Sequence, residues 1–264
     1  MRETFPLEQK SIYLIREGII RSKKPAILWS CGKDSTTMLS LIRDAFGGAV
    51  PIPVIFIDTG YHMPELLEFR DECVDKWNLN LVIAKAGLED ETAYTPEKNK
   101  LDCCYQRKTL AVKLIGSQFD LLILGIRRDE HGVRAKERVF SQRTADWTWD
   151  FENQPPELWY NYVLPIDKDA HTRLHPLLHW TELDVWKYLK DKQLPICPLY
   201  YAVDGFRFRS LGCKPCTKPI ESDADTIDKI IKEVKESRIA ERSGRSQDKE
   251  DSFAMERLKA LGYM

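Results

Sequence analysis

Apolar and polar positions alternate in blocks along the first half of the chain, and each block has the length of one strand or one helix. Short apolar runs predict buried strands at 25–29, 54–57, 79–84 and 120–125. Helical spacing predicts helices at 7–20, 35–45, 64–77 and 104–115. Strands that alternate with helices imply an α/β fold, a doubly wound and mostly parallel sheet with helices on both faces.

The second half of the chain is less regular. The segment 147–167 is aromatic and contains prolines, and we expect an ordered loop or lid there. A capping box from Thr181 to Asp184 predicts a helix through Leu189. The histidines at 171, 175 and 179 are expected at the surface or in a substrate loop. From 221 to 264 the sequence is charged and helical, so we predict a main domain of residues 1–220 and a C-terminal arm of residues 221–264.

Composition narrows the class of protein. The chain has 264 residues, 43% hydrophobic and 31% charged, which is the balance of a globular protein. It has no apolar run of the roughly 18 residues that a membrane span needs and no signal peptide, so we expect a cytoplasmic protein. The net charge of −1 argues against a protein that binds nucleic acid unaided. Seven cysteines in a reducing compartment suggest metal or redox chemistry rather than disulfides.

The loop 30–35 lies between a predicted strand and a predicted helix, at the sheet edge where ligands bind in such folds. Gly32 permits close approach of the backbone to an anion, and Lys33 adds a positive charge to the free N–H groups of the helix start. The loop is not a Walker A motif, because Leu28 stands in place of its first glycine and Asp34 follows the lysine. The alternative is a polar turn in which Asp34 or Ser35 caps the helix.

The sequence Ser30-Cys31-Gly32-Lys33-Asp34-Ser35 resembles the phosphate loop of the PP-loop ATP pyrophosphatases, which have the adenine nucleotide alpha hydrolase-like fold. That family cleaves ATP between its α and β phosphates and passes AMP to an acceptor oxygen. The resemblance implies that Ser30, Gly32, Lys33, Asp34 and Ser35 bind ATP, that Mg²⁺ bridges the phosphates, and that Lys33 and Asp34 are catalytic.

Cys31 departs from this pattern, because the family has glycine at its position. A thiol at a helix N-terminus beside Lys33 should have a lowered pKa and be reactive. We therefore predict that Cys31 is catalytic, accepting sulfur or gating the site by oxidation. The alternative is a neutral replacement by another small residue.

Further motifs extend the resemblance to most of the chain. The segment Asp58-Thr59-Gly60 resembles phosphoadenylylsulfate and adenylylsulfate reductases and the small subunit of bacterial sulfate adenylyltransferase. The segments 125–130, 134–138 and 153–159 and the Ser-Gly-Arg at 243–245 resemble that small subunit. The resemblance adds Asp58 and Gly125 to the ATP-binding residues and Arg127 and Arg128 to the catalytic ones.

Basic residues concentrate in the segment 127–143, which has six positive and three negative side chains. Arginine pairs with two oxygens of an anion at once, so ATP phosphates, sulfate and nucleic-acid phosphates are all candidate ligands. The alternative is an ion-paired helix face exposed to solvent.

Four cysteines fall into two pairs, Cys103-Cys104 and Cys213-x-x-Cys216. With their neighbours they resemble the signature of adenylylsulfate reductases, which implies that these four residues bind a [4Fe-4S] cluster. A zinc site or ordinary buried thiols are the alternatives. Those reductases use a further cysteine near the C-terminus, and this chain has none after Cys216, so reduction by that mechanism is not expected.

Together these features predict an ATP pyrophosphatase of sulfur metabolism that activates a phosphate oxygen for sulfur insertion, as in bacterial DNA phosphorothioation. Its expected partners are a cysteine desulfurase and other sulfur-modification subunits, which would deliver the DNA. One alternative is the small subunit of sulfate adenylyltransferase with a GTPase partner. Another is a nucleotide-binding subunit without turnover. The sequence leaves the oligomeric state open, with a homodimer as one option.

Overall fold

The computed structural model describes residues 4–144, 146–149, 171–237, 241–245, 257–258 and 262. Within these ranges no helix combines the length and the apolar character that crossing a membrane requires. The predicted loop or lid lies outside the described residues from position 150 onward, as does the motif at 153–159.

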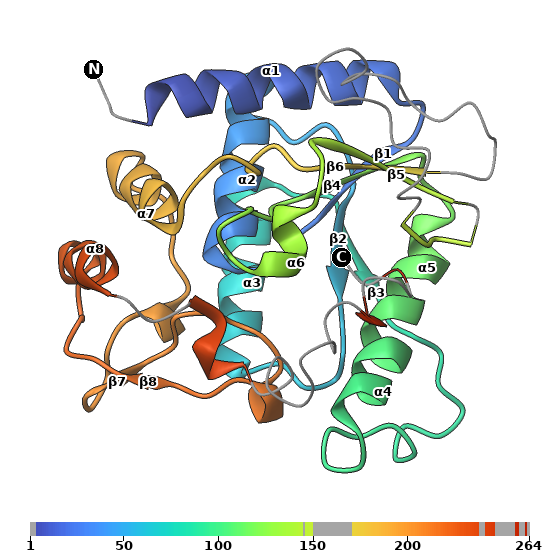
Figure 1. The fold of residues 1–264 in the computed structure, drawn as a ribbon. Coiled ribbons are helices and arrows are strands. Elements are labelled where there is room, and N and C mark those ends of the chain that lie inside the picture. Colours follow the sequence, from blue (N-terminus) through green and yellow to red (C-terminus); the bar gives the residue numbers. More distant parts are fainter. Residues whose placement is uncertain are drawn as a thin grey trace.

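A six-stranded sheet forms the centre of the molecule (Figure 1). Its strand order is β3-β2-β1-β4-β6-β5, and all neighbours are parallel except β5 and β6. The strands are β1 (Pro25–Leu28), β2 (Val54–Ile57), β3 (Leu81–Ala84), β4 (Leu121–Leu124), β5 (Phe140–Arg143) and β6 (His171–Leu174). A separate two-stranded ribbon pairs β7 (Phe206–Arg207) with β8 (Ile220–Glu221). The predicted doubly wound, mostly parallel sheet is therefore confirmed.

Helices cover both sides of this sheet, with α2 and α3 on one side and α4 and α5 on the other (Figure 1). The helices are α1 (Phe5–Arg21), α2 (Lys33–Ala45), α3 (Pro64–Trp77), α4 (Lys100–Cys104), α5 (Leu110–Gly116), α6 (Gly132–Ala135), α7 (Glu182–Asp191) and α8 (Ile227–Glu236). Shorter turns are the π-helical turn η1 (Tyr105–Thr109) and the 3₁₀ turns η2 (Pro198–Tyr200), η3 (Lys214–Cys216) and η4 (Glu241–Gly244).

Local signals set several of these boundaries. Pro64 occupies the first turn of α3, where its missing N–H costs nothing, and Asn78 ends the helix in a left-handed conformation. The predicted capping box is present at the start of α7, where Thr181 and Asp184 each accept from the other's backbone N–H. The predicted helix 104–115 is interrupted by η1, and a π-helical turn of this kind is common at functional sites.

The surface position expected for the three histidines is correct only for His179. His171 lies in β6 and stacks on Trp147 with ring centroids 3.7 Å apart, and the Nδ1–H of His175 donates to the carbonyl of Arg138 at 2.7 Å. Both side chains are buried. Burial lowers the pKa of His171 to about 2 and that of His175 to about 4, so both rings are neutral at pH 7.

The C-terminal part of the chain packs on the main body. Helix α8 lies beside α7, and its Ile230 is buried in the same hydrophobic core as the central strands. The described segment 241–245 then returns to the carboxyl ends of the strands. The boundary at residue 220 between two domains stays a prediction.

Candidate functional site

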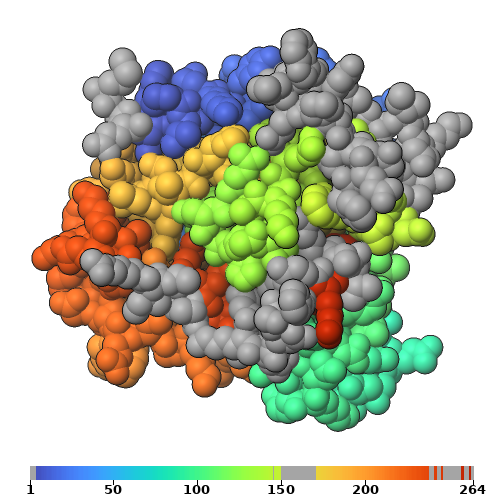
Figure 2. Space-filling model, in the orientation of Figure 1, coloured from blue at the N-terminus to red at the C-terminus, as the bar shows by residue number. Residues whose placement is uncertain are grey.

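A pocket opens at the carboxyl ends of β1, β2 and β4, where the strand rule places ligands. Its lining includes the predicted nucleotide-binding residues Ser30, Gly32, Lys33, Asp34, Ser35 and Gly125. Thr59, His62 and Tyr200 contribute to the walls. Glu241, Arg242 and Arg245 of the C-terminal segment also line it. In the space-filling view, red atoms of the C-terminal segments are visible between the green and the orange parts of the surface (Figure 2).

The phosphate loop joins β1 to α2 in a tight turn. Cys31 has a left-handed backbone (φ 60°), and Gly32 is extended and directly precedes the first residue of α2. The backbone N–H of Lys33 donates to the Tyr200 hydroxyl at 2.9 Å, and the hydroxyl of Ser35 donates to the carbonyl of Gly32 at 3.1 Å. The N-terminus of the 13-residue helix α2 therefore faces the pocket, which favours an anion there.

Gly125 ends β4 and packs directly on the start of α2. A Cβ atom at this position would lie 3.0 Å from the backbone carbon and oxygen of Asp34 and from Cα of Ser35. The absence of a side chain at 125 therefore allows the strand and the phosphate loop to touch.

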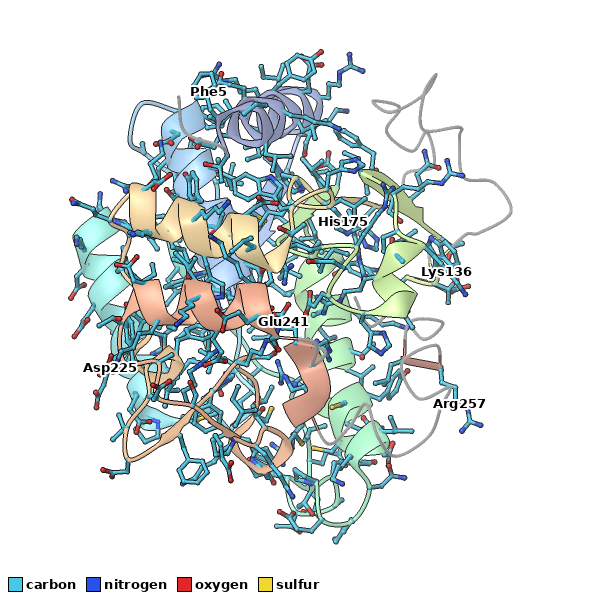
Figure 3. All side chains as sticks on the ribbon, turned by 60° about the vertical axis from the view of Figure 1, so that its left-hand side comes forward. Phe5, Lys136, His175, Asp225, Glu241 and Arg257 are labelled. Atoms are coloured by element: carbon cyan, nitrogen blue, oxygen red, sulfur yellow. The ribbon has the colours of Figure 1, made fainter. Side chains whose placement is uncertain are left out.

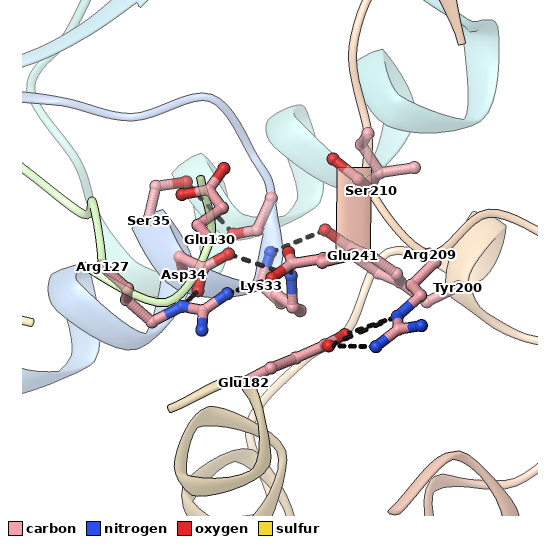
Figure 4. A network of polar contacts seen from close by, with 12 residues as sticks. Lys33, Asp34, Ser35, Arg127, Glu130, Glu182, Tyr200, Arg209, Ser210 and Glu241 are labelled. Carbon is pink, nitrogen blue, oxygen red and sulfur yellow. Dashed lines mark hydrogen bonds and ion pairs between the residues drawn. The ribbon is translucent and has the colours of Figure 1, made fainter. Parts of the chain in front are cut away.

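Two buried cations, Lys33 and Arg127, share two carboxylates, Asp34 and Glu241, at the start of α2 (Figure 4). Lys33 Nζ pairs with Asp34 Oδ2 at 3.1 Å and with Glu241 Oε1. Arg127 pairs through Nε with Asp34 at 2.5 Å, through Nη1 with Asp129 at 2.5 Å and through Nη2 with Glu241 Oε2. Burial opposes both positive charges, but Asp34 and Glu241 raise the pKa of Lys33 and of Arg127 above their ordinary values. Both cations are therefore permanently charged.

A second group of charges surrounds this pair. Glu130 bridges Arg134 and Arg242, and these two guanidinium groups lower the pKa of Glu130 against the effect of burial. Arg209 pairs with Glu182 at 2.8 Å on the other side (Figure 4). The pocket is thus charged with both signs. Arg127 and Arg134 are buried, so they do not form the solvent-exposed helix face that was the alternative.

Not every predicted residue reaches the pocket. Asp58 lies outside its lining and accepts from the backbone N–H of Gly60 at 2.8 Å. Arg128 also lies outside the lining and contacts His179 Nδ1 at 3.3 Å. The ATP-binding role of Asp58 and the catalytic role of Arg128 remain predictions.

The lowered pKa expected for the Cys31 thiol is wrong, and the catalytic role of Cys31 stays a prediction. Its side chain is 1% exposed and belongs to the hydrophobic core rather than to the pocket. Burial raises the pKa of the Cys31 thiol well above its ordinary value, and the nearby Cys73 thiol adds to the effect. Proximity to a helix N-terminus does not lower the pKa here, because the desolvation of the thiol is the larger effect.

The four cysteines predicted as cluster ligands are brought together beside the pocket. Cys103 and Cys104 lie at the end of α4, and Cys213 and Cys216 lie around η3; all four are buried. Burial raises the pKa of Cys103 to about 11, and the charges of the other three thiols add to this effect. Cys213 also lines the pocket.

Cys213 differs from its neighbours in its electrostatics. Its Sγ lies 3.3 Å from Thr59 Oγ1. Lys108, together with this hydrogen bond and Arg245, lowers the pKa of Cys213 although burial opposes the thiolate. Within the described ranges, no three His, Cys, Asp or Glu side chains converge as a single metal ion requires. The described thiols therefore do not form a ready-made metal site, and the [4Fe-4S] cluster on Cys103, Cys104, Cys213 and Cys216 stays a prediction.

Sequence reasoning missed the part of the pocket that comes from distant segments. Tyr200 and Glu241 line the pocket but belong to no motif of the phosphate loop. The one available signal was the Ser-Gly-Arg at 243–245, which includes Arg245.

Fold and pocket together define a protein of the α/β nucleotide-binding class, with a charged pocket at the N-terminus of α2. The family model for the phosphoadenosine phosphosulfate reductase domain matches residues 24–219, and the chain belongs to this family. It is 38% identical to sulfate adenylyltransferase subunit 2 of Rhizobium meliloti (strain 1021), over 97% of this chain and 92% of that protein. It is also 38% identical to the same subunit of Geobacter metallireducens, over 97% of this chain and 96% of that protein.

Among solved structures, yeast FAD synthetase in complex with FAD shares the fold. The match has a TM-score of 0.56 at 18% identity and covers 93% of this chain and 92% of that one. At this identity the likeness concerns the fold alone.

Proposed function

We propose that the protein is an adenylyltransferase of sulfur metabolism that transfers AMP from ATP to an oxygen of sulfate and releases pyrophosphate. The observation that carries the proposal is the pair of buried cations, Lys33 and Arg127, at the N-terminus of α2 inside the pocket. Its support from relatives is the identity of 38% to sulfate adenylyltransferase subunit 2 over nearly the whole chain. These relatives favour sulfate over DNA as the acceptor.

The reaction would need charge stabilisation more than acid–base chemistry. An acceptor oxygen attacks the α-phosphorus, the bond from that phosphorus to the bridging oxygen breaks, and pyrophosphate leaves with the electron pair. Lys33, Arg127 and the N–H groups of α2 would stabilise the charge that develops on the leaving group. Mg²⁺ bound with ATP would neutralise further phosphate charge, and the pocket carboxylates of Asp34 and Glu130 offer the oxygen ligands it takes.

The name "subunit 2" of the relatives suggests that this chain works with another subunit, for which a GTPase is the expected kind. The test is sulfate-dependent release of pyrophosphate from ATP, measured on the protein copurified with its partner subunits. We expect release that depends on sulfate and is abolished by Lys33→Met. ATP hydrolysis or binding that is indifferent to Lys33 would contradict the proposal.

A second candidate is sulfur insertion into a nucleic-acid phosphate, as in DNA phosphorothioation with a cysteine desulfurase. The observation that favours it is the group of four thiols beside the pocket, with Cys213 in the pocket wall. In this case ATP would adenylylate a non-bridging phosphate oxygen, and sulfur would replace the oxygen that carries AMP. Cys103, Cys104, Cys213 and Cys216 would hold a [4Fe-4S] cluster, which would hold or position the sulfur.

Anaerobic purification followed by iron and sulfide analysis separates the two candidates. About four irons per chain, lost in Cys103→Ser and Cys213→Ser, would support the second. Cys73→Ser is the matched control, because Cys73 is buried on α3 and should leave the iron content unchanged. An iron-free protein that forms adenylylsulfate would eliminate the second candidate, whereas phosphorothioate formed from DNA with the desulfurase would establish it.

A further inference from the structure

One carboxylate in the phosphate-binding region comes from the far end of the chain. Glu241 belongs to η4 and lies 208 positions after Lys33 in the sequence. One of its oxygens pairs with Lys33 Nζ and the other with Arg127 Nη2 (Figure 4). The side chain of Glu241 is 6% exposed, so this bridge is shielded from water.

The carboxylate of Glu241 lies between Lys33 and Arg127, a position that suits a phosphate ligand. Two cations at the N-terminus of a helix form an anion site, and two oxygens of a phosphate would contact them as the two oxygens of Glu241 do. The same Nζ and Nη2 groups cannot hold the Glu241 carboxylate and a phosphate together without placing two negative groups against each other. Like charges at such a distance in a buried site repel strongly.

We propose that Glu241 is an internal competitor of the phosphate ligand: it fills the anion subsite between Lys33 and Arg127, and ATP or pyrophosphate enters by displacing it. The inference rests on the proposed binding of ATP at this loop. It gives the segment 241–245 the role of a strap that leaves the subsite when the nucleotide binds.

The rest of the strap is fastened outside the subsite. Arg242 pairs with Glu130, and Arg245 donates to Ser210 Oγ at 3.1 Å, to Thr217 Oγ1 at 3.3 Å and to the carbonyl of Leu211. None of these partners is Lys33 or Arg127. Glu241, which is labelled near the centre of Figure 3, can therefore leave its two cations while Arg245 holds the other end of the segment.

Close packing keeps the Arg245 attachment in place. A Cβ atom on Gly212 would lie 1.5 Å from Arg245 Nη1, so the guanidinium group sits directly on the backbone of the loop. Arg245 thus attaches the strap to the loop 210–217 by several hydrogen bonds, and the side chain of Glu241 attaches it to Lys33 and Arg127. Moving the side chain of Glu241 out of the subsite is a smaller change than detaching the whole segment 241–245.

The first test measures binding of inorganic pyrophosphate by calorimetry, with and without Mg²⁺, in the full-length protein and in Glu241→Gln. We expect pyrophosphate to bind about tenfold more tightly to the variant, since the competing charge is gone and the binding-competent fraction rises. Glu233→Gln is the matched control. Glu233 pairs with the buried Arg207 at 2.5 Å and does not line the pocket, so this variant should bind pyrophosphate with the affinity of the wild type.

The outcomes separate this inference from the proposed function. Equal or weaker binding in Glu241→Gln overturns competition while leaving ATP binding in place. If no form binds pyrophosphate or ATP, the proposed function fails and the inference with it. Thermal unfolding of each variant shows whether its fold is kept.

A second readout does not depend on a variant. Hydrogen exchange of a peptide containing 241–245 should become faster when the wild-type protein is saturated with pyrophosphate, because the strap leaves the subsite. Slower exchange would mean that the segment closes over the ligand, and that result would overturn the proposal even if the affinities changed as expected.

Discussion

The contact between Gly125 and the start of α2 gives a prediction that joins stability to ligand binding. In Gly125→Ala the new methyl group would meet three backbone atoms of residues 34 and 35 at 3.0 Å. Backbone atoms cannot rotate away as a flexible side chain can, so β4 and α2 must separate by a few tenths of an ångström. Overpacking of this kind costs about 1–3 kcal/mol.

The displaced atoms belong to the phosphate loop, so the substitution should lower both the stability of the fold and the affinity for pyrophosphate. We expect the midpoint of thermal unfolding to fall by roughly 2–4 °C for each kcal/mol lost, and pyrophosphate to bind several-fold more weakly. Gly87→Ala is the control, because Gly87 is exposed and a Cβ there meets no atom within 4 Å. It should be neutral or slightly stabilising. A Gly125→Ala protein as stable as this control, with unchanged pyrophosphate affinity, would refute the reasoning.

Three other features give predictions of their own. In Lys33→Met the buried Glu241 loses one of its two cations. The free energy of unfolding, measured in urea, should therefore fall by about 3–5 kcal/mol, and pyrophosphate binding should disappear. A fall below about 1 kcal/mol would contradict a buried ion pair. Native Cys31 should resist iodoacetamide at pH 8 under conditions that fully label the unfolded chain, because burial raises its pKa, and rapid labelling detected by mass mapping would show the opposite. Asp120 accepts from Ser22 and from two backbone N–H groups, and these donors lower its pKa against burial. Its contribution to stability is present above its ordinary pKa near 4 and is lost as the pH falls through the lowered value. Asp120→Asn should therefore lose about 1 kcal/mol at pH 7, because solvent screens this partly exposed carboxylate, and less as the pH falls through the lowered pKa. A loss that is equal at every pH in urea titrations would exclude this origin.

The strands β1, β2 and β4 were predictable because each is an apolar run inside the sheet, largely buried on both faces. The edge strand β3 is also an apolar run, although only its Ala84 is buried. The strands β5 and β6 were not, because their sequences, Phe-Ser-Gln-Arg and His-Thr-Arg-Leu, contain polar residues at buried positions. Arg143 of β5 is buried against Glu137 at 3.1 Å, so an ion pair takes the place of the apolar signal. Periodicity does not detect a strand of this kind.

The part of the site formed by neighbouring residues of one loop was predictable, whereas the part formed by residues from distant segments was not. The loop 30–35 follows from the rule for strand ends and Gly125 from the family resemblance, and apart from Cys31 these residues line the pocket. Glu241 reaches Lys33 only through the folded chain, and no spacing rule connects residues so far apart. The error over Cys31 has a geometric cause: the rule for helix ends assumes a side chain that faces the anion, whereas its left-handed backbone places the thiol in the core.

Arg245 connects the pocket with the group of four cysteines. It lines the pocket, holds the loop 210–217 by its hydrogen bonds, and contributes to the low pKa of Cys213. A chimaera that received only the Cys-x-x-Cys loop from this protein would lack the arginine that fixes it. Transplanting the thiol chemistry into another scaffold would require Gly212 and Arg245 to be moved together with the cysteines.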